Sequence, residues 1–237
     1  MGASGSFTYV DGGTFLTLTV FTLTLSRKRC LSMTKLFVFD LGKVILPFEH
    51  RQIAVKLHQY ASPAAGTAPE DLFRFVFAKS EGLVNEYEEG NMTSAEFFQE
   101  IRKAFRLDIT YDLFKEIWND IFQDSPEVNR AILHLKERGY PLFLLSNVSE
   151  LHFLHIIDQY PIVHAFDEWI LSFEVGAKKP EKRIYDVIFE RADVPPAQVF
   201  YVDDIPEFVE AAGRYGIPGM VFQDAEGLWA MIREKGI

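Results

Sequence analysis

Short apolar runs recur along the chain, and each is followed by a polar residue. The first, at 36–39, reads LFVF and precedes Asp40, and similar runs lie at 141–146, 199–204 and 218–222, with a shorter one at 169–171. Runs of this kind are typical of strands that are buried on both faces of a parallel sheet. The pattern therefore predicts a sheet of parallel strands spread over the whole chain after residue 35.

Stretches with helical spacing separate these runs. Ser125 and Pro126 are typical of a helix start and Gly139 of its end, and helices are also expected over 180–191, 206–215 and 225–235. Strands that alternate with helices indicate an α/β fold with a right-handed, doubly wound, Rossmann-like parallel sheet.

The segment 48–123 breaks the alternation, because it contains no buried strand pattern. Helices are expected over 52–60 and 69–79, and Thr93 with Glu96 has the spacing of a capping box before an apolar stripe. We predict a core formed by residues 33–47 and 124–237, with residues 48–123 inserted as a helical cap domain. The alternative is a helical decoration that is continuous with one core.

The first 32 residues differ from the rest. Threonines alternate with apolar residues over 14–25, which is a strand period, and a basic stretch follows at 26–29. A secretory signal carries its basic residues before the apolar run, and this run is shorter than the about 20 residues that span a bilayer. Because Met33 directly precedes the first buried strand, we expect residues 1–32 to be an extension outside the fold. A weak membrane anchor is the alternative.

Composition restricts the partners. The chain has 237 residues, of which 48% are hydrophobic, so it can bury a sizeable core. A net charge of −10 argues against a nucleic-acid or membrane partner. The single cysteine, Cys30, excludes an internal disulfide and fits a cytoplasmic location. No pattern specifies an oligomeric state.

Polar residues at the strand ends carry the functional signal. Asp40, Ser146 and the pair Asp203–Asp204 end three predicted strands, and Lys179 lies in a loop before a helix. Ligands of doubly wound sheets bind beyond the carboxyl ends of the strands, so these side chains are expected in one crevice. Clustered carboxylates favour a hard cation, and Mg²⁺ binds through one or two carboxylates together with phosphate oxygens.

The residue types indicate phosphoryl transfer. Asp40 can attack phosphorus and form an aspartyl phosphate, while Lys179 and Ser146 stabilise the phosphoryl oxygens. Each residue also has an ordinary alternative: a strand-end aspartate or serine is often a turn or cap residue, and a loop lysine often faces solvent. The order of all of them along the chain favours the functional interpretation.

Four segments, FVFDLGKVI, LLSNVSELH, VGAKKPEKRIY and FYVDDIPEFVEAA, resemble the four successive motifs of the haloacid dehalogenase-like (HAD) superfamily. The resemblance covers residue 33 to the C-terminus and is strongest to bacterial phosphatases with a D-L-G first motif, including a glucose-1-phosphatase. It implies a helical cap, a Mg²⁺ cofactor and a small phosphorylated substrate. The roles that it implies are a nucleophile and metal ligand at Asp40, further metal ligands at the Gly42 carbonyl, Asp203 and Asp204, and phosphate-binding residues at Ser146, Asn147, Lys179, Gly42 and Lys43.

Two positions depart from the pattern. Many phosphatases of the superfamily carry an acid–base aspartate two residues after the nucleophile, and this chain has Gly42 there. A good leaving group such as the anomeric oxygen of a sugar 1-phosphate, or a substitute acid such as Glu49 or His50, can compensate. A polar residue that is common four positions after Asp204 is replaced by Phe208.

Other functions remain open at this level. In the cap, Glu86 and Tyr87 are candidates for contacting the substrate. A 2-haloacid dehalogenase also uses an aspartate nucleophile, but its metal-free chemistry gains nothing from Asp203 and Asp204. A catalytically weak or silent binding protein is the other alternative.

Overall fold

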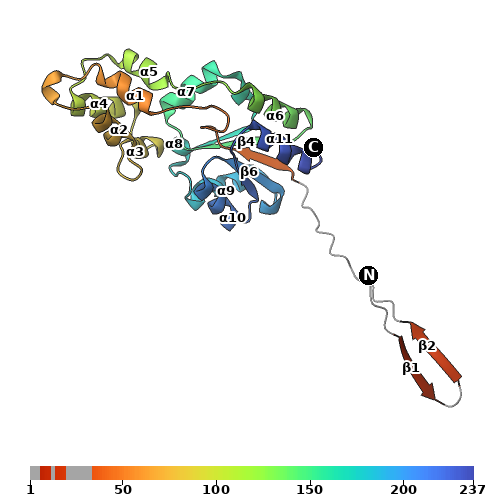
Figure 1. The fold of residues 1–237 in the computed structure, drawn as a ribbon. Helices are drawn as coiled ribbons and strands as arrows, with labels where there is room; N and C mark the ends of the chain where they lie inside the picture. Colours follow the sequence, from red (N-terminus) through yellow and green to blue (C-terminus); the bar gives the residue numbers. More distant parts are fainter. Residues whose placement is uncertain (1–5, 12–13, 20–33) are drawn as a thin grey trace. The chain divides into compact units, whose positions relative to one another are not determined.

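The computed structural model describes residues 6–11, 14–19 and 34–237, and it divides into one unit over Met1–Met33 and another over Thr34–Ile237 (Figure 1). In the first unit, β1 (Ser6–Asp11) pairs antiparallel with β2 (Thr14–Thr19). The first part of the alternating pattern at 14–25 thus forms a strand, Thr14–Thr19. The rest of that run, the basic stretch at 26–29 and Cys30 lie outside the described residues.

The second unit is built on a five-stranded parallel sheet with the order β5-β4-β3-β6-β7. Its strands are β3 (Leu36–Phe39), β4 (Leu142–Ser146), β5 (Glu168–Leu171), β6 (Val199–Asp203) and β7 (Gly219–Val221). Each coincides with a predicted apolar run. The doubly wound α/β fold is confirmed.

Alternate residues of β3 face opposite layers of helices, which is why the whole strand is apolar. Phe37 and Phe39 pack with one cluster of helical side chains, and Leu36 and Val38 with another. The first layer contains α6 (Pro126–Glu137), α7 (Glu150–Gln159) and α11 (Ala225–Glu234). The second contains α9 (Lys182–Arg191) and α10 (Pro206–Arg214). The short helix α8 (Ser172–Val175) follows β5, and 3₁₀ turns lie at Pro63–Ala65, Pro161–Ala165 and Pro196–Gln198.

Five helices lie between β3 and α6 and gather at one end of this unit (Figure 1). They are α1 (Arg51–His58), α2 (Pro69–Phe77), α3 (Val84–Glu88), α4 (Ser94–Phe105) and α5 (Tyr111–Asn119). Their apolar faces form a cluster of their own around Phe97, Phe114 and Trp118. We refer to these helices as the cap; its predicted boundaries, 48–123, stay a prediction.

Helix starts follow the predicted chemistry in one case and differ in another. The Thr93 hydroxyl accepts a hydrogen bond from the Glu96 amide, and the Glu96 carboxylate accepts one from the Thr93 amide, which completes the capping box. Ser125 occupies the N-cap position of α6, but its hydroxyl makes no capping hydrogen bond. Pro126 at the first helical position therefore favours the start of α6, because its ring fixes φ near the helical value.

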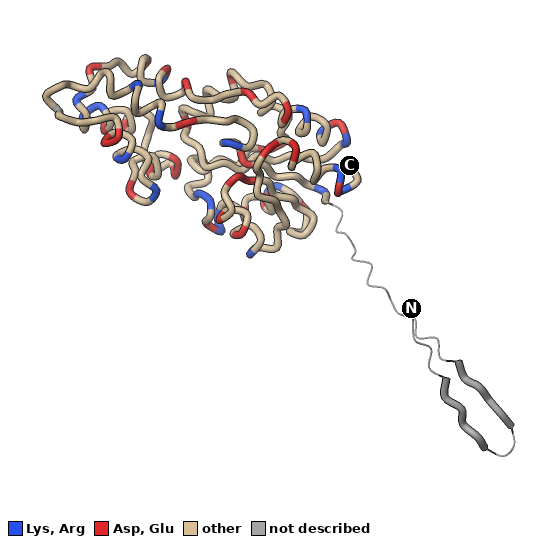
Figure 2. Tube along the Cα trace, in the orientation of Figure 1, with Lys and Arg blue, Asp and Glu red and all other residues tan. Residues whose placement is uncertain are grey.

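Within the described residues, no helix has the length and apolar character needed to cross a bilayer. Lys and Arg positions are interspersed with Asp and Glu positions along the described residues (Figure 2).

Candidate active site

Three carboxylates meet at the carboxyl ends of two adjacent strands. Asp40 follows β3, and Asp203 and Asp204 end and follow β6. Because β3 and β6 pair in parallel, their ends lie side by side, and one carboxylate oxygen from each aspartate lies within 4.8 Å of the others. The convergence expected for these residues is present.

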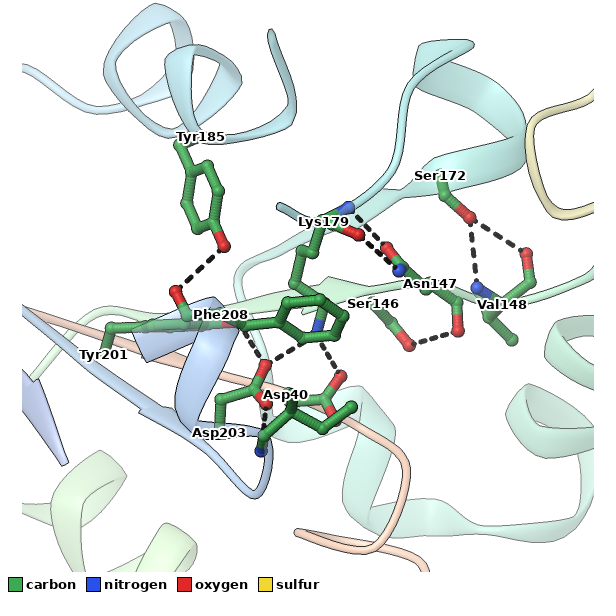
Figure 3. A network of polar contacts seen from close by, with 11 residues as sticks. Asp40, Ser146, Asn147, Val148, Ser172, Lys179, Tyr185, Tyr201, Asp203 and Phe208 are labelled. Atoms are coloured by element: carbon green, nitrogen blue, oxygen red, sulfur yellow. Dashed lines mark hydrogen bonds and ion pairs between the residues drawn. The ribbon is translucent and has the colours of Figure 1, made fainter. Parts of the chain in front are cut away.

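The Lys179 ammonium lies between two of these carboxylates (Figure 3). Its Nζ is 2.7 Å from Asp40 Oδ1 and 2.7 Å from Asp203 Oδ2, and its side chain is 1% exposed. Burial lowers the pKa of Lys179, but the two carboxylates outweigh it and the net shift is upward. The lysine is therefore a fixed cation and no proton donor at neutral pH.

The carboxylates repel one another despite the lysine. Burial raises the pKa of Asp40 to about 7 against the opposing effect of Lys179, and the charges of Asp203 and Asp204 add to the rise. Burial and Asp203 also raise the pKa of Asp204. Three acids with one lysine thus hold an excess of negative charge, which a divalent cation would remove.

Two aromatic rings complete the surroundings of the lysine. Its Nζ lies 5.1 Å from the centre of the Phe208 ring and 6.0 Å from that of Tyr201. The Tyr201 hydroxyl donates to Asp203 Oδ2, and the Ile205 amide donates to Asp203 Oδ1 at 2.8 Å. Phe208, the departure from the superfamily pattern, therefore packs against the lysine as a cation–π partner.

The loop after β4 is tied to the lysine loop through Asn147. Its side-chain oxygen accepts from the Lys179 amide at 2.8 Å, and its side-chain nitrogen donates to the Lys179 carbonyl at 3.1 Å (Figure 3). The Ser172 hydroxyl in turn contacts the amide of Val148 at 3.1 Å and its carbonyl at 3.3 Å. Both contacts hold the backbone that follows Ser146, which ends β4 and is buried.

Gly42 lies beside the ring of Phe48. A Cβ built on Gly42 would be 2.6 Å from Phe48 Cε1, closer than real carbon atoms approach. The ring thus occupies the space that a side chain at this position needs. Lys43, next to Gly42, is exposed with φ of 58°, and its Nζ lies 5.4 Å from the Phe48 ring centre.

A cavity of about 40 Å³ lies between the cap and the strand ends. Core residues and cap residues both line it: Leu41, Gly42, Phe48, His50, Glu88, Phe122, Ser146, Asn147, Val148, His152 and Ile156. This cavity holds roughly three waters, so it is too small for a sugar phosphate while the cap stays in this position.

The two predicted acid–base substitutes lie in different surroundings. His50 lines the cavity, stacked on Phe77 with ring centres 4.4 Å apart, and burial lowers its pKa to about 4. Glu49 is exposed, accepts a hydrogen bond from the Arg51 amide at 3.0 Å and is absent from the cavity lining.

Several residues of the site are not marked by the sequence patterns described above. Tyr201 lies within the apolar run at 199–204 and Phe48 at the start of the cap segment, and the roles of both depend on tertiary contacts. Ser172 follows the shortest predicted strand, and the strand-end rule applied to that strand would have found it. In the cap, the Tyr87 hydroxyl shares a hydrogen bond with Ser94 at 2.7 Å and is absent from the cavity lining, whereas the neighbouring Glu88 is part of that lining.

The donor set fits magnesium. Mg²⁺ prefers hard oxygen ligands, keeps several waters and needs only one or two carboxylates with a phosphate. Asp40, Asp203 and Asp204 offer carboxylate oxygens close to one another, and burial together with the charge of Asp203 raises the pKa of Asp40 and of Asp204.

The family follows from a match along most of the chain. The model of a hydrolase family, described as haloacid dehalogenase-like hydrolase, matches residues 34–216. The chain belongs to the haloacid dehalogenase-like hydrolase family. This assignment agrees with the order in which Asp40, Ser146, Lys179 and Asp203 occur along the chain.

Two of the named relatives of this HAD hydrolase are phosphatases, while others are (S)-2-haloacid dehalogenases. It is 26% identical over 178 residues to a D-ribitol-5-phosphate phosphatase of Bacteroides thetaiotaomicron, covering 73% of this chain and 84% of that protein. It is 26% identical over 103 residues to a phosphorylated carbohydrates phosphatase of Thermotoga maritima, covering 44% of this chain and 48% of the relative.

A solved structure shares the fold. A HAD family enzyme from Bacteroides thetaiotaomicron, crystallised with magnesium and inorganic phosphate, superposes with a TM-score of 0.71 at 23% identity. The match covers 83% of this chain and 99% of that one. The arrangement of sheet and helices in Thr34–Ile237 is therefore that of a HAD enzyme.

Proposed function

We propose that this chain is a magnesium-dependent phosphatase that hydrolyses small phosphorylated metabolites, preferably sugar phosphates, through an aspartyl phosphate on Asp40. The observation that carries the proposal is the meeting of Asp40, Asp203 and Asp204 with the Lys179 ammonium at the carboxyl ends of β3 and β6. Three acids and one buried lysine at one point suit a site that binds a cation and a phosphate together.

Each residue has a distinct part in this proposal. The free oxygen of Asp40 attacks phosphorus, and Lys179 neutralises charge that develops on the phosphoryl oxygens. Ser146 and Asn147 hold the phosphate, with the Asn147 amide also fixing the Lys179 backbone. Asp40, the Gly42 carbonyl, Asp203 and Asp204 would hold Mg²⁺, which would neutralise the carboxylates and polarise the phosphoryl group. Lys43 adds positive charge at the rim of the pocket.

The relatives support the substrate class. Both are named for phosphorylated carbohydrates or a sugar-alcohol phosphate, and the Bacteroides structure contains magnesium and inorganic phosphate. Aldose 1-phosphates are the preferred substrates in this proposal, because their anomeric oxygen leaves more easily than a primary alcohol and Gly42 supplies no proton.

The test is turnover of p-nitrophenyl phosphate with Mg²⁺, with EDTA, and in Asp40→Asn. The proposal predicts Mg²⁺-dependent release of p-nitrophenol that Asp40→Asn abolishes. A panel of sugar phosphates then compares glucose 1-phosphate with glucose 6-phosphate, and the 1-phosphate is expected to react faster. Equal turnover by wild type and Asp40→Asn would remove the proposal.

The alternative is a 2-haloacid dehalogenase-type reaction, which uses the same nucleophile without a metal. Release of chloride from 2-chloropropionate in EDTA, without phosphatase activity, would favour it. The three close carboxylates argue against it, since their repulsion has no purpose in a metal-free site.

A further inference from the structure

The position that carries an acid–base aspartate in many HAD phosphatases is closed in this chain. A side chain at Gly42 would collide with the Phe48 ring, which packs edge-on against Phe122 with ring centres 5.9 Å apart. If the enzyme uses a proton donor for the leaving group, that donor must reach the cavity from another element.

Glu88 is the carboxylic acid among the described residues that line the cavity. It is the last residue of α3, so it reaches the cavity from the cap, opposite Ser146 and Asn147 of the core. Among the described residues, no hydrogen bond or ion pair occupies its carboxyl group. The Glu88 carboxyl therefore shares a cavity with Ser146 and Asn147 and has no partner that would give it a purely structural role.

The end of α3 is held against the core, which fixes where Glu88 lies. Lys178 Nζ bonds Asn85 Oδ1 at 2.6 Å and Glu89 Oε1 at 3.0 Å, so the residue before Lys179 contacts two residues that lie one turn apart on the same face of α3. On the far side, the Leu151 amide donates to the Tyr87 hydroxyl at 3.1 Å. Contacts from two core segments therefore hold the residues that flank Glu88.

The charges around Glu88 suit proton transfer. Burial raises its pKa to about 7, while Lys178 and Lys179 oppose the rise and Glu89 adds to it. The two other titratable side chains of the cavity, His50 and His152, have pKa values lowered by burial to about 4 and about 3. At neutral pH both imidazoles are therefore neutral and weak acids, whereas an acid whose pKa lies near the working pH is the most effective catalyst.

We propose that Glu88, supplied by the cap, is the general acid and base that takes the place of the side chain missing at Gly42. The inference rests on the proposed phosphatase function. In the first step Asp40 forms a bond to phosphorus, the bond from phosphorus to the ester oxygen breaks, and that oxygen takes the proton of the Glu88 carboxyl. In the second step the Glu88 carboxylate takes a proton from water as the water oxygen attacks phosphorus. The bond to Asp40 then breaks, which releases phosphate and returns both carboxyls to their starting states.

The role predicts a dependence on the leaving group. Phenyl phosphate and p-nitrophenyl phosphate differ by one substituent, but phenol is a much weaker acid than p-nitrophenol and its oxygen needs a proton to leave. In Glu88→Gln, kcat/KM for phenyl phosphate is expected to fall by about 10²–10⁴-fold, and that for p-nitrophenyl phosphate by at least about tenfold less. Because the second step also loses its base, p-nitrophenol is expected to appear in a pre-steady-state burst.

The pH profile gives a second readout. In wild type, kcat/KM for phenyl phosphate is expected to fall as pH rises through about 7, where Glu88 loses its proton, and in Glu88→Gln this limb disappears. Glu81→Gln is the matched control, because it makes the same change at an exposed glutamate of the cap that lies outside the cavity lining. It is expected to keep the wild-type leaving-group dependence.

The outcomes separate the two proposals. An equal loss for both esters in Glu88→Gln, or no loss, would overturn the role of Glu88 while leaving the phosphatase in place. The same loss in Glu81→Gln would also overturn it. Absence of Mg²⁺-dependent turnover of either ester by wild type would instead remove the phosphatase function itself.

Discussion

Lys179 is buried between two carboxylates at the base of the site. Breaking a buried ion pair by removing one partner is far more destabilising than breaking an exposed one, because the remaining charges keep their desolvation cost. The Asp40–Lys179–Asp203 group therefore stabilises the fold at the strand ends, and in the proposed function Lys179 also faces the phosphate.

Gly42 can be tested by restoring the missing side chain. Its φ lies outside the left-handed region, so the backbone accepts an aspartate and only the Phe48 ring opposes it. Gly42→Asp is expected to lower the free energy of unfolding by about 1–3 kcal/mol through overpacking. In a Phe48→Ala background the same substitution is expected to cost much less, measured as a double-mutant cycle by urea unfolding. Additive effects of the two changes would contradict the steric explanation.

The raised pKa of Glu88 predicts that the stability of the protein depends on pH. Its pKa is about 7 in the folded protein against a usual value of 4.5, so the folded state binds more protons than the unfolded state between these values. The free energy of unfolding therefore falls as pH rises from about 4.5 to 7 and levels off above. Glu88→Gln removes this contribution, so its stability relative to wild type should rise by on the order of 2 kcal/mol between pH 4.5 and pH 8. Unfolding in EDTA at both pH values checks this, and a constant difference between the two proteins would contradict it.

The site residues that end or follow a strand could be predicted from the sequence. The residues that reach the site only through tertiary packing could not. Asp40, Asp203, Asp204 and Ser146 each end or follow a buried run, so the rule for parallel sheets places them. Glu88 ends a five-residue helix and comes to the cavity only through the docking of the cap, which no local pattern encodes.

The strands and the longer helices were predictable because their apolar positions repeat over many residues. The helix α3 was not, since five residues are too few to show a period. Its docking depends on Gly90, where φ is 75° and a Cβ would overlap the carbonyl oxygen of Phe173 in α8.

This contact yields a prediction for the docking of α3. Gly90→Ala is expected to destabilise the protein by more than Gly139→Ala, the matched control, whose φ is 82° and whose added Cβ would meet nothing within 4 Å. Gly139→Ala reports the cost of the left-handed conformation alone, about 1 kcal/mol. Thermal unfolding of the two variants measures the difference in stability. Equal losses of stability would show that the contact between the turn after α3 and α8 is not tight enough to exclude a Cβ.

At the scale of the whole molecule, the cap covers a cavity of about 40 Å³. A sugar phosphate needs more room than this cavity offers, so under the proposed function we expect the cap to move away from the strand ends to admit substrate. The contacts of Tyr87 and Lys178 across this boundary hold the cap in the present position.

The first unit is expected to be dispensable. The family match begins at residue 34, β3 at Leu36, and β1 and β2 pair with each other in a sheet of their own. A chain that starts at Met33 should keep the thermal midpoint and the kcat/KM of the full chain, because the unit Thr34–Ile237 contains the site and its hydrophobic clusters. A marked loss of either would show that residues 1–32 support the fold.

The most direct test of the central claim is to trap the phosphorylated enzyme. The reaction of Glu88→Gln with p-nitrophenyl phosphate and Mg²⁺ is stopped with acid during the burst, and the peptides are mapped by mass spectrometry. The account predicts a phosphoryl group on Asp40 that is absent in EDTA and absent in Asp40→Asn. Turnover without any adduct on Asp40 in wild type and Glu88→Gln, together with an active Asp40→Asn, would contradict it.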